Sequence, residues 1–91
     1  MNASVVDNAA RSRFELSEQG LVAHADYVRD GARLILAHVE APPQLRGTGA
    51  AGRLMSGTLE LARAQGLRVV PRCPYAKAFI KRHPEFQDLV A

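Results

Sequence analysis

The first half of the chain alternates hydrophobic and polar residues with a period of two. Residues 13–16 and 21–29 follow this pattern, which is typical of strands with one buried face. The turn pair Asp30-Gly31 then leads into a mostly apolar segment over residues 32–39, which predicts a well-buried third strand. We therefore expect an antiparallel meander over residues 13–40. The second strand has two faces, one with Leu21, Ala23, Ala25 and Tyr27 and the other with Val22, His24, Asp26 and Val28.

Between Thr48 and Gln65 the period changes to that of an amphipathic helix, and Gly66 follows where a helix C′ glycine belongs. Residues 67–71 predict a further strand, and residues 74–82 a short second helix. The expected fold class is α+β: an antiparallel meander, a crossover helix, a strand parallel to its neighbour and a C-terminal helix. The longer helix has an apolar side (Ala51, Leu54, Met55, Thr58, Leu59, Leu61 and Ala62) and a polar side (Arg53, Ser56, Gly57, Glu60 and Arg63).

Size and composition indicate one domain. The chain has 91 residues, of which 47% are hydrophobic and 23% are charged, as in ordinary globular proteins. A chain this short has a modest core. We expect a loose leader over residues 1–12 and a single domain over residues 13–91.

No pattern in the sequence signals a membrane or secretion. The longest uncharged apolar run, Leu34 to Val39, has six residues, whereas a bilayer span needs roughly 20. The N-terminus lacks the basic and long apolar regions of a signal peptide. The single cysteine, Cys73, excludes an intramolecular disulfide and suits a reducing compartment. We expect a cytoplasmic protein without membrane contact, either a monomer or a weak dimer.

The net charge of +3 is divided unevenly along the chain. Residues 1–43 carry four basic and six acidic side chains (−2), whereas residues 44–91 carry eight basic and three acidic ones (+5). We therefore expect an anionic partner on the C-terminal half. A phosphorylated cofactor and nucleic acid both fit this charge. Nucleic acid is the weaker candidate, because no RNA- or DNA-binding motif accompanies it.

A glycine-rich segment, Gln44-Leu45-Arg46-Gly47-Thr48-Gly49-Ala50, joins the meander to the longer helix. Glycines let the backbone approach a ligand closely, and a helix N-terminus adds a positive dipole end, so the segment suits a pyrophosphate. A plain strand-to-helix turn is the alternative. The segment is not a P-loop, because no Gly-Lys-Ser/Thr closes it. A dinucleotide fingerprint is also excluded, because the unit that follows is too short and has no acidic residue after a second strand.

The segment from Val70 to Tyr75 follows the last expected strand, where α/β folds often build sites. Cys73 lies at a predicted helix N-terminus, where a thiol can be reactive. It can equally be a small buried hydrophobe between Pro71 and Pro74. Tyr75 is either a core aromatic or a proton donor.

His38 and Glu40 are two residues apart and therefore lie on one face of their strand. Either could deprotonate an amine, although Glu40 could also simply face solvent. A structural role is the alternative for His38 and our interpretation of His24. We interpret His83, beside a proline, as a surface or capping residue. No cluster of His, Cys, Asp and Glu has metal-ligand spacing, so we expect no metal.

Together these residues resemble the small, single-domain (YjdJ-type) branch of the GNAT N-acetyltransferase superfamily. The superfamily's acetyl-CoA signature, Gln/Arg-x-x-Gly-x-Gly/Ala, is matched by Gln44, Gly47 and Gly49. The small branch adds a glutamate before a double proline, matched by residues 38–43, and an ending matched by residues 69–75 and 79–85.

The resemblance covers about residues 13–91 and implies a compact GNAT-like fold that binds acetyl-CoA as acyl donor. The pyrophosphate would lie on the loop amides, and the pantetheine arm between two splayed parallel strands. Arg46, Arg53 and the basic residues of the last helix, including Arg82, would be available to the 3′-phosphate. The residues implied to bind acetyl-CoA are Val39, Gln44, Leu45, Arg46, Gly47, Thr48, Gly49, Ala50, Cys73, Lys77 and Lys81.

The resemblance also implies direct transfer of the acetyl group from the thioester to a primary amine. Glu40 would assist deprotonation of the amine, and Tyr75 or Cys73 would protonate the departing thiolate. An acetyl-Cys73 intermediate is less favoured, because no evident activating base lies next to the thiol.

The sequence departs from larger GNAT enzymes in the region that would recognise the amine acceptor, and the acceptor is unknown. Larger GNAT enzymes insert helices between their first two strands, whereas only residues 17–20 intervene here. The acceptor could be a protein lysine, a protein terminus or a small amine. The residues leave open whether the protein is an efficient enzyme, a weak one, or a non-catalytic acyl-CoA-binding or partner-binding module.

Overall fold

The computed structural model describes residues 5–91, which form a mixed five-stranded sheet in the order β1-β2-β3-β4-β5. Neighbours are antiparallel except β4 and β5, which are parallel, so the expected α+β class and crossover are confirmed. The strands are β1 (Val5–Asn8), β2 (Arg13–Glu18), β3 (Leu21–Asp30), β4 (Arg33–Glu40) and β5 (Arg68–Pro71). The helices are α1 (Ala50–Ala64) and α2 (Pro74–Arg82), with 3₁₀ turns at Ala9–Arg11, Pro43–Leu45 and Pro84–Leu89.

The meander expected over residues 13–40 is confirmed. A two-residue turn, Gln19–Gly20, joins β2 to β3, and both residues have positive φ (55° and 74°). The two faces of β3 differ in burial as their composition suggests, because Ala23 and Ala25 are fully buried whereas Val28 is exposed.

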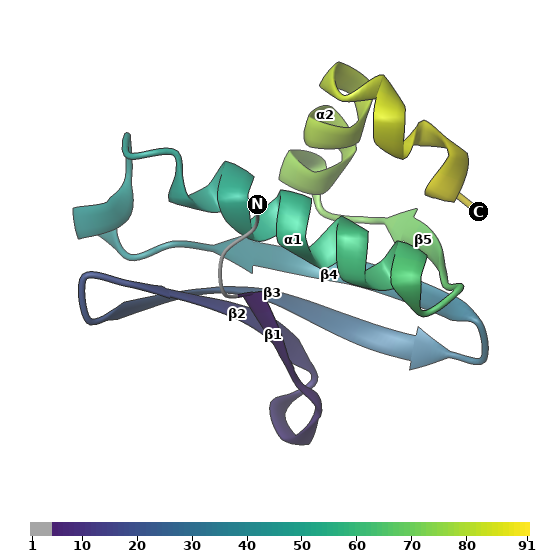
Figure 1. Cartoon of the computed structure of the whole chain (residues 1–91), viewed down its shortest axis with the longest axis horizontal. Helices are drawn as coiled ribbons and strands as arrows, with labels where there is room; N and C mark the ends of the chain where they lie inside the picture. Colours follow the sequence, from purple (N-terminus) through teal and green to yellow (C-terminus); the bar gives the residue numbers. More distant parts are fainter. Residues whose placement is uncertain (1–4) are drawn as a thin grey trace.

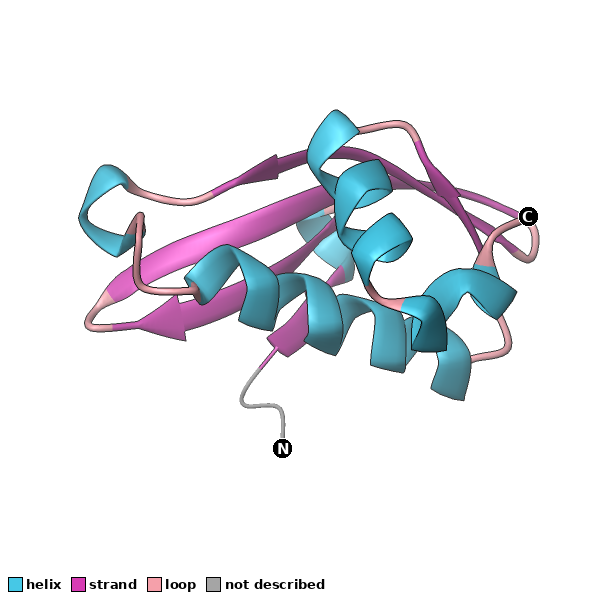
Figure 2. Ribbon diagram, turned by 90° about the horizontal axis from the view of Figure 1, so that it is seen from above, coloured by secondary structure: helices cyan, strands magenta, loops and turns pink. Residues whose placement is uncertain are grey.

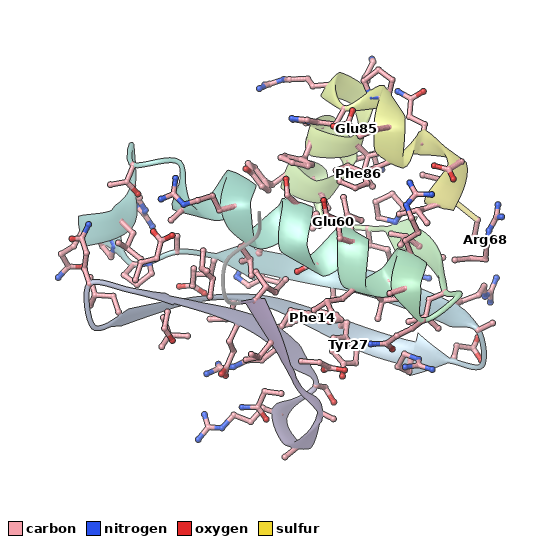
Figure 3. All side chains as sticks on the ribbon, in the orientation of Figure 1. Phe14, Tyr27, Glu60, Arg68, Glu85 and Phe86 are labelled. Carbon is pink, nitrogen blue, oxygen red and sulfur yellow. The ribbon has the colours of Figure 1, made fainter. Side chains whose placement is uncertain are left out.

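Both helices cover the same face of the sheet (Figures 1 and 2). The core lies between this face and α1, and the rings of Phe14 and Tyr27 pack there with centroids 5.0 Å apart (Figure 3). Among the described residues, no helix covers the opposite face, which we call the open face. The fully buried core side chains include Leu16, Leu34, Leu36, Leu54, Met55, Leu59 and Val69.

The N-terminal segment differs from the loose leader expected over residues 1–12. Val5–Asn8 is a strand that pairs with β2, and the Tyr27 hydroxyl donates a 2.6 Å hydrogen bond to Asp7. Gly57 is buried rather than polar-facing, because Val5 packs where a Cβ at position 57 would lie. Four residues are too few to show a period, and pairing with β2 makes them a strand. Residues 1–4 of the expected leader lie outside the described residues.

A bulge in β4 decides which of its side chains reach the open face. The register with β3 shifts by one residue, so Ala37 is an extra residue in β4. Without the bulge, His38 would share the buried face of Leu36. With it, His38 and Glu40 both lie on the open face, as their spacing of two predicts.

Candidate functional site

β4 and β5 separate before β4 ends. Their register finishes with the pair Leu36–Pro71, and the amides of Arg72 and Cys73 both donate to the Leu36 carbonyl at 3.0 Å. The chain then turns into α2, whereas β4 continues to Glu40. Beyond this fork, the end of β4 has no strand on its β5 side among the described residues.

A cleft of about 490 Å³ opens at the fork. Its walls come from the end of β4, the glycine-rich loop, the first turn of α1 and the start of α2. The lining residues are His38, Val39, Glu40, Ala41, Arg46, Ala51 and Tyr75. Segments far apart in the sequence therefore contribute to one cavity of ligand size.

The glycine-rich loop is closed by its own hydrogen bonds. The Thr48 hydroxyl donates to the Leu45 carbonyl at 2.6 Å and accepts from the Ala50 amide at 3.3 Å. Gly47 and Gly49 have φ of +80° and +86°, a left-handed conformation that other residues rarely adopt. The two glycines therefore permit the tight path of the chain into α1.

Four backbone amides at this loop donate to no acceptor in the described part of the chain: those of Gly47, Gly49, Ala51 and Gly52. Two of them belong to loop residues expected to bind a pyrophosphate, and two belong to the first turn of α1. Free amides at a helix N-terminus, together with the positive end of the helix dipole, suit an anion. Arg46 lies beside them in the cleft wall and has no ion pair with a described residue.

Arg53, expected to be available to a phosphate, is already engaged. Its Nε and Nη2 donate to the Glu18 carboxylate at 2.7 and 2.8 Å, and its Nη1 donates to the Thr48 carbonyl at 3.1 Å. The hydrogen bonds from Arg53 hold the pKa of Glu18 below its usual value. Arg53 therefore ties β2 to the glycine-rich loop and positions it.

Tyr75 lies in the cleft wall at the start of α2, with 39% of its surface exposed. Burial raises the pKa of its hydroxyl above the usual value, while the nearby Arg82 charge acts in the opposite direction. The phenol is therefore protonated at neutral pH and can donate a proton.

Several residues selected from the sequence do not line the cleft. Cys73 is only 6% exposed. Lys77 and Lys81 are exposed, but at 100° per residue they lie about 160° and 120° around α2 from Tyr75. Arg82 lies only about 20° from Tyr75 on the same wheel. The other residues expected to bind acetyl-CoA that do not line the cleft are Gln44, Leu45, Gly47, Thr48, Gly49 and Ala50, which lie in or next to the glycine-rich loop.

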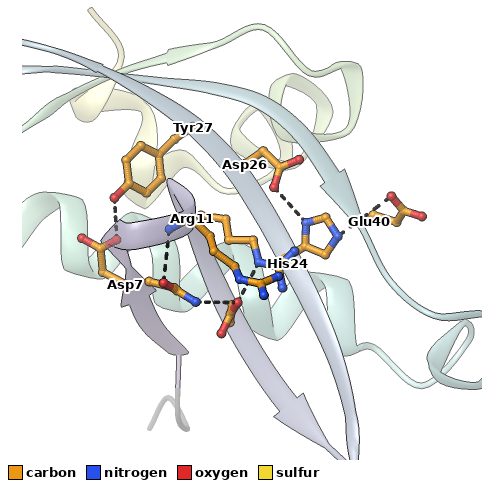
Figure 4. Close-up of polar contacts among 9 residues, drawn as sticks. Asp7, Arg11, His24, Asp26, Tyr27 and Glu40 are labelled. Atoms are coloured by element: carbon orange, nitrogen blue, oxygen red, sulfur yellow. Dashed lines mark hydrogen bonds and ion pairs between the residues drawn. The ribbon is translucent and has the colours of Figure 1, made fainter.

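Sequence reasoning missed a second histidine near Glu40. One Glu40 carboxylate oxygen lies 3.1 Å from His38 Nε2. The same oxygen lies 4.0 Å from His24 Nε2 (Figure 4). His24 faces Glu40 because the shifted register makes them cross-strand partners. The sequence contains no signal for the bulge that sets this pairing. By contrast, His83 caps α2 as expected: it stacks on the Phe79 ring, and its Nδ1 lies 2.8 Å from the Phe79 carbonyl.

Two kinds of site are absent from residues 5–91. No group of three or more His, Cys, Asp and Glu side chains is arranged to hold a metal ion. No helix among them has the length and apolar character needed to cross a membrane.

The fold is similar to that of a solved structure, the NMR solution structure of a GCN5-like protein from Staphylococcus aureus. That protein is described as a proposed N-acetyltransferase. The TM-score is 0.74 at 21% sequence identity, over 99% of this chain and 89% of that one. A family model described as GCN5-related N-acetyl-transferase matches residues 13–89. The chain belongs to this family, in agreement with the resemblance to the small GNAT branch. No protein of curated function shows a significant match to the sequence.

Proposed function

We propose that this protein is an acetyl-CoA-dependent N-acetyltransferase that moves the acetyl group directly to a primary amine. The observation that carries the proposal is the cleft at the β4–β5 fork, where Glu40, Tyr75 and Arg46 line one cavity beside the glycine-rich loop. A carboxylate, a phenol and a set of anion-binding amides are the groups that this reaction needs.

The donor would be held along the loop and the fork. The free amides of Gly47 and Gly49 suit the pyrophosphate, and Arg46 adds a positive charge. The pantetheine arm would extend β4 at Val39, where β5 has turned away. Arg82, on the Tyr75 side of α2, is better placed for the 3′-phosphate than Lys77 or Lys81.

The proposed chemistry uses two ionisable side chains of the cleft, Glu40 and Tyr75. The amine nitrogen attacks the thioester carbon, a C–N bond forms, and the C–S bond breaks. Glu40 accepts the proton that the nitrogen loses, and Tyr75 donates a proton to the departing thiolate. Cys73 needs no covalent role, which agrees with its burial.

No helix is inserted between β2 and β3 to enclose the amine acceptor. Only the two-residue turn Gln19–Gly20 joins β2 to β3, and Glu40 lies at the open face. We propose a protein lysine, a protein terminus or a small amine as acceptor. We place the activity in the cytoplasm, where acetyl-CoA is available and a free thiol such as Cys73 persists.

Thermal unfolding with acetyl-CoA tests donor binding. At a hundred times its dissociation constant, acetyl-CoA should stabilise the protein by about 2.7 kcal/mol. The same unfolding temperature with and without millimolar acetyl-CoA would contradict the proposed function.

Release of free CoA thiol with a panel of amines tests turnover. Glu40→Gln keeps the size of the side chain and removes the base, so kcat should fall about 100-fold. Glu85→Gln is the matched control, because Glu85 is exposed in the C-terminal 3₁₀ turn, away from the cleft. Binding of acetyl-CoA without thiol release for any amine would favour the non-catalytic acyl-CoA-binding module.

A further inference from the structure

We propose that His24 and Asp26 form a proton-accepting unit with Glu40, in which Asp26 orients His24 and His24 takes the proton that Glu40 removes from the amine. This inference rests on the proposed function and adds two positioning residues to it. The juxtaposition of His24, Asp26 and Glu40 on the open face carries the inference.

The three side chains form a chain of polar contacts across β3 and β4 (Figure 4). His24 Nδ1 lies 2.9 Å from a carboxylate oxygen of Asp26. On the other side of the ring, Nε2 lies 4.0 Å from the Glu40 carboxylate. Glu40 in turn lines the cleft. The imidazole therefore lies between a surface carboxylate and the candidate base.

Asp26 determines which nitrogen of neutral His24 carries the proton. An ionised carboxylate only accepts hydrogen bonds, so Nδ1 must be the donor in the 2.9 Å contact. The neutral ring then presents the lone pair of Nε2 to Glu40. In this tautomer His24 can accept a proton from Glu40, either directly after a small rotation of that side chain or through one water.

The charged groups near His24 come from three strands. Besides Asp26 and Glu40, its cross-strand neighbour on β2 is Glu15, whose carboxylate is partly compensated by an ion pair with Arg13 at 2.7 Å. On β4, His38 Nε2 lies 3.1 Å from a Glu40 carboxylate oxygen, and Arg46 and Tyr75 line the cleft together with Glu40. Carboxylate side chains from β2, β3 and β4 are therefore the neighbours of the His24 ring.

His24 suits this role better than His38, although His38 lies closer to Glu40. The His38 side chain is 57% exposed, and its only hydrogen-bond partner among the described residues is Glu40. The His24 side chain is 20% exposed and has its orientation set by Asp26. A base held in one orientation loses less entropy in reaching the reactive geometry. After the transfer, the imidazolium can lose its proton to water at the open face.

The first test measures the tautomer of His24 directly. In ¹⁵N NMR spectra of the intact protein at a pH where the ring is neutral, His24 should be protonated on Nδ1. Asp26→Asn should remove this preference. Protonation of neutral His24 on Nε2 in the wild type, or an unchanged tautomer in Asp26→Asn, would overturn the inference.

The second test is kinetic and uses one amine for all variants, so that the ionisation of the amine cancels in rate ratios. His24→Gln and Asp26→Asn should lower kcat about tenfold, less than loss of Glu40 itself, and leave KM for acetyl-CoA unchanged. Val28→Thr, also on the open face, is the matched control and should retain the wild-type kcat.

These outcomes separate this inference from the proposed function. A wild type that releases thiol, with kcat unchanged in both variants, would overturn the inference and keep the acetyltransferase. A wild type that binds acetyl-CoA and releases no thiol with any amine would overturn both, even if the tautomer of His24 depends on Asp26.

Discussion

At the scale of single residues, the two candidate proton donors, Tyr75 and Cys73, differ sharply in solvent exposure. Tyr75 lines the cleft with 39% of its surface exposed, whereas Cys73, two residues earlier, is 6% exposed. The amide of Cys73 donates to the Leu36 carbonyl and so helps to hold the fork. The two residues therefore have different expected roles, with the phenol in the chemistry and the thiol in the core.

Substitution of these two residues should separate the roles. Tyr75→Phe retains the ring that packs near Phe79 and removes the proton donor, so kcat should fall about tenfold or more while acetyl-CoA binding is kept. Cys73→Ala should lower kcat at most a few-fold and reduce the free energy of unfolding by about 1 kcal/mol. Loss of turnover in Cys73→Ala, with acetyl-Cys73 detected by mass spectrometry in the wild type, would instead indicate a covalent intermediate.

At the scale of elements, the two ends of α1 have glycines with the same backbone conformation and different surroundings. Gly49 precedes the helix with φ +86°, and Gly66 follows it with φ +70°. A Cβ at Gly49 would lie 3.0 Å from Arg53 Nη1, whereas a Cβ at Gly66 would meet nothing within 4 Å. Only the first end contributes free amides to the glycine-rich loop.

Gly49→Ala and Gly66→Ala form a matched pair of variants. Both should lose about 1 kcal/mol of stability, because a left-handed conformation is unfavourable for alanine. Only Gly49→Ala should also weaken acetyl-CoA binding, by about tenfold, because it displaces the loop amides and the Arg53–Thr48 hydrogen bond. Isothermal titration measures this difference. Equal affinities in the two variants would show that the loop does not hold the donor.

At the scale of the whole molecule, a buried phenol on β3 links the N-terminal strand to the sheet interior. Tyr27 is 8% exposed and donates to Asp7 across β2. Burial first, and then the Asp7 carboxylate, raise the pKa of Tyr27 to about 12. The folded protein thus favours the protonated phenol more than the unfolded chain does.

This difference predicts how stability depends on alkaline pH. The contribution of Tyr27 should be complete below pH 10, the usual value for tyrosine, and lost as pH rises from about 10 to about 12. Tyr27→Phe should cost about 1–2 kcal/mol at pH 8 and little at pH 12. Urea unfolding of the wild type and Tyr27→Phe at pH 8, 10 and 12 measures this difference. If the difference between their free energies of unfolding stays constant with pH, the role of the hydrogen bond is refuted.

The sequence by itself determined the family and every strand and α-helix after residue 12. The periods of two and 3.6 are local properties, so they predicted the meander, both helices and the parallel crossover. The motif around Gln44, Gly47 and Gly49 pointed to the acetyltransferase family, which the family match confirms. The same local patterns selected Glu40 and Tyr75 as candidates for chemistry.

Only the tertiary structure decided which of these groups meet. The bulge at Ala37 places His24 opposite Glu40, and the fork after Leu36 opens the cleft. The orientation of α2 turns Tyr75 toward the cleft and the two lysines away from it. These features depend on register and on packing between segments distant in sequence, which no local period encodes. The same cause explains why a four-residue N-terminal segment becomes β1 only when β2 is beside it.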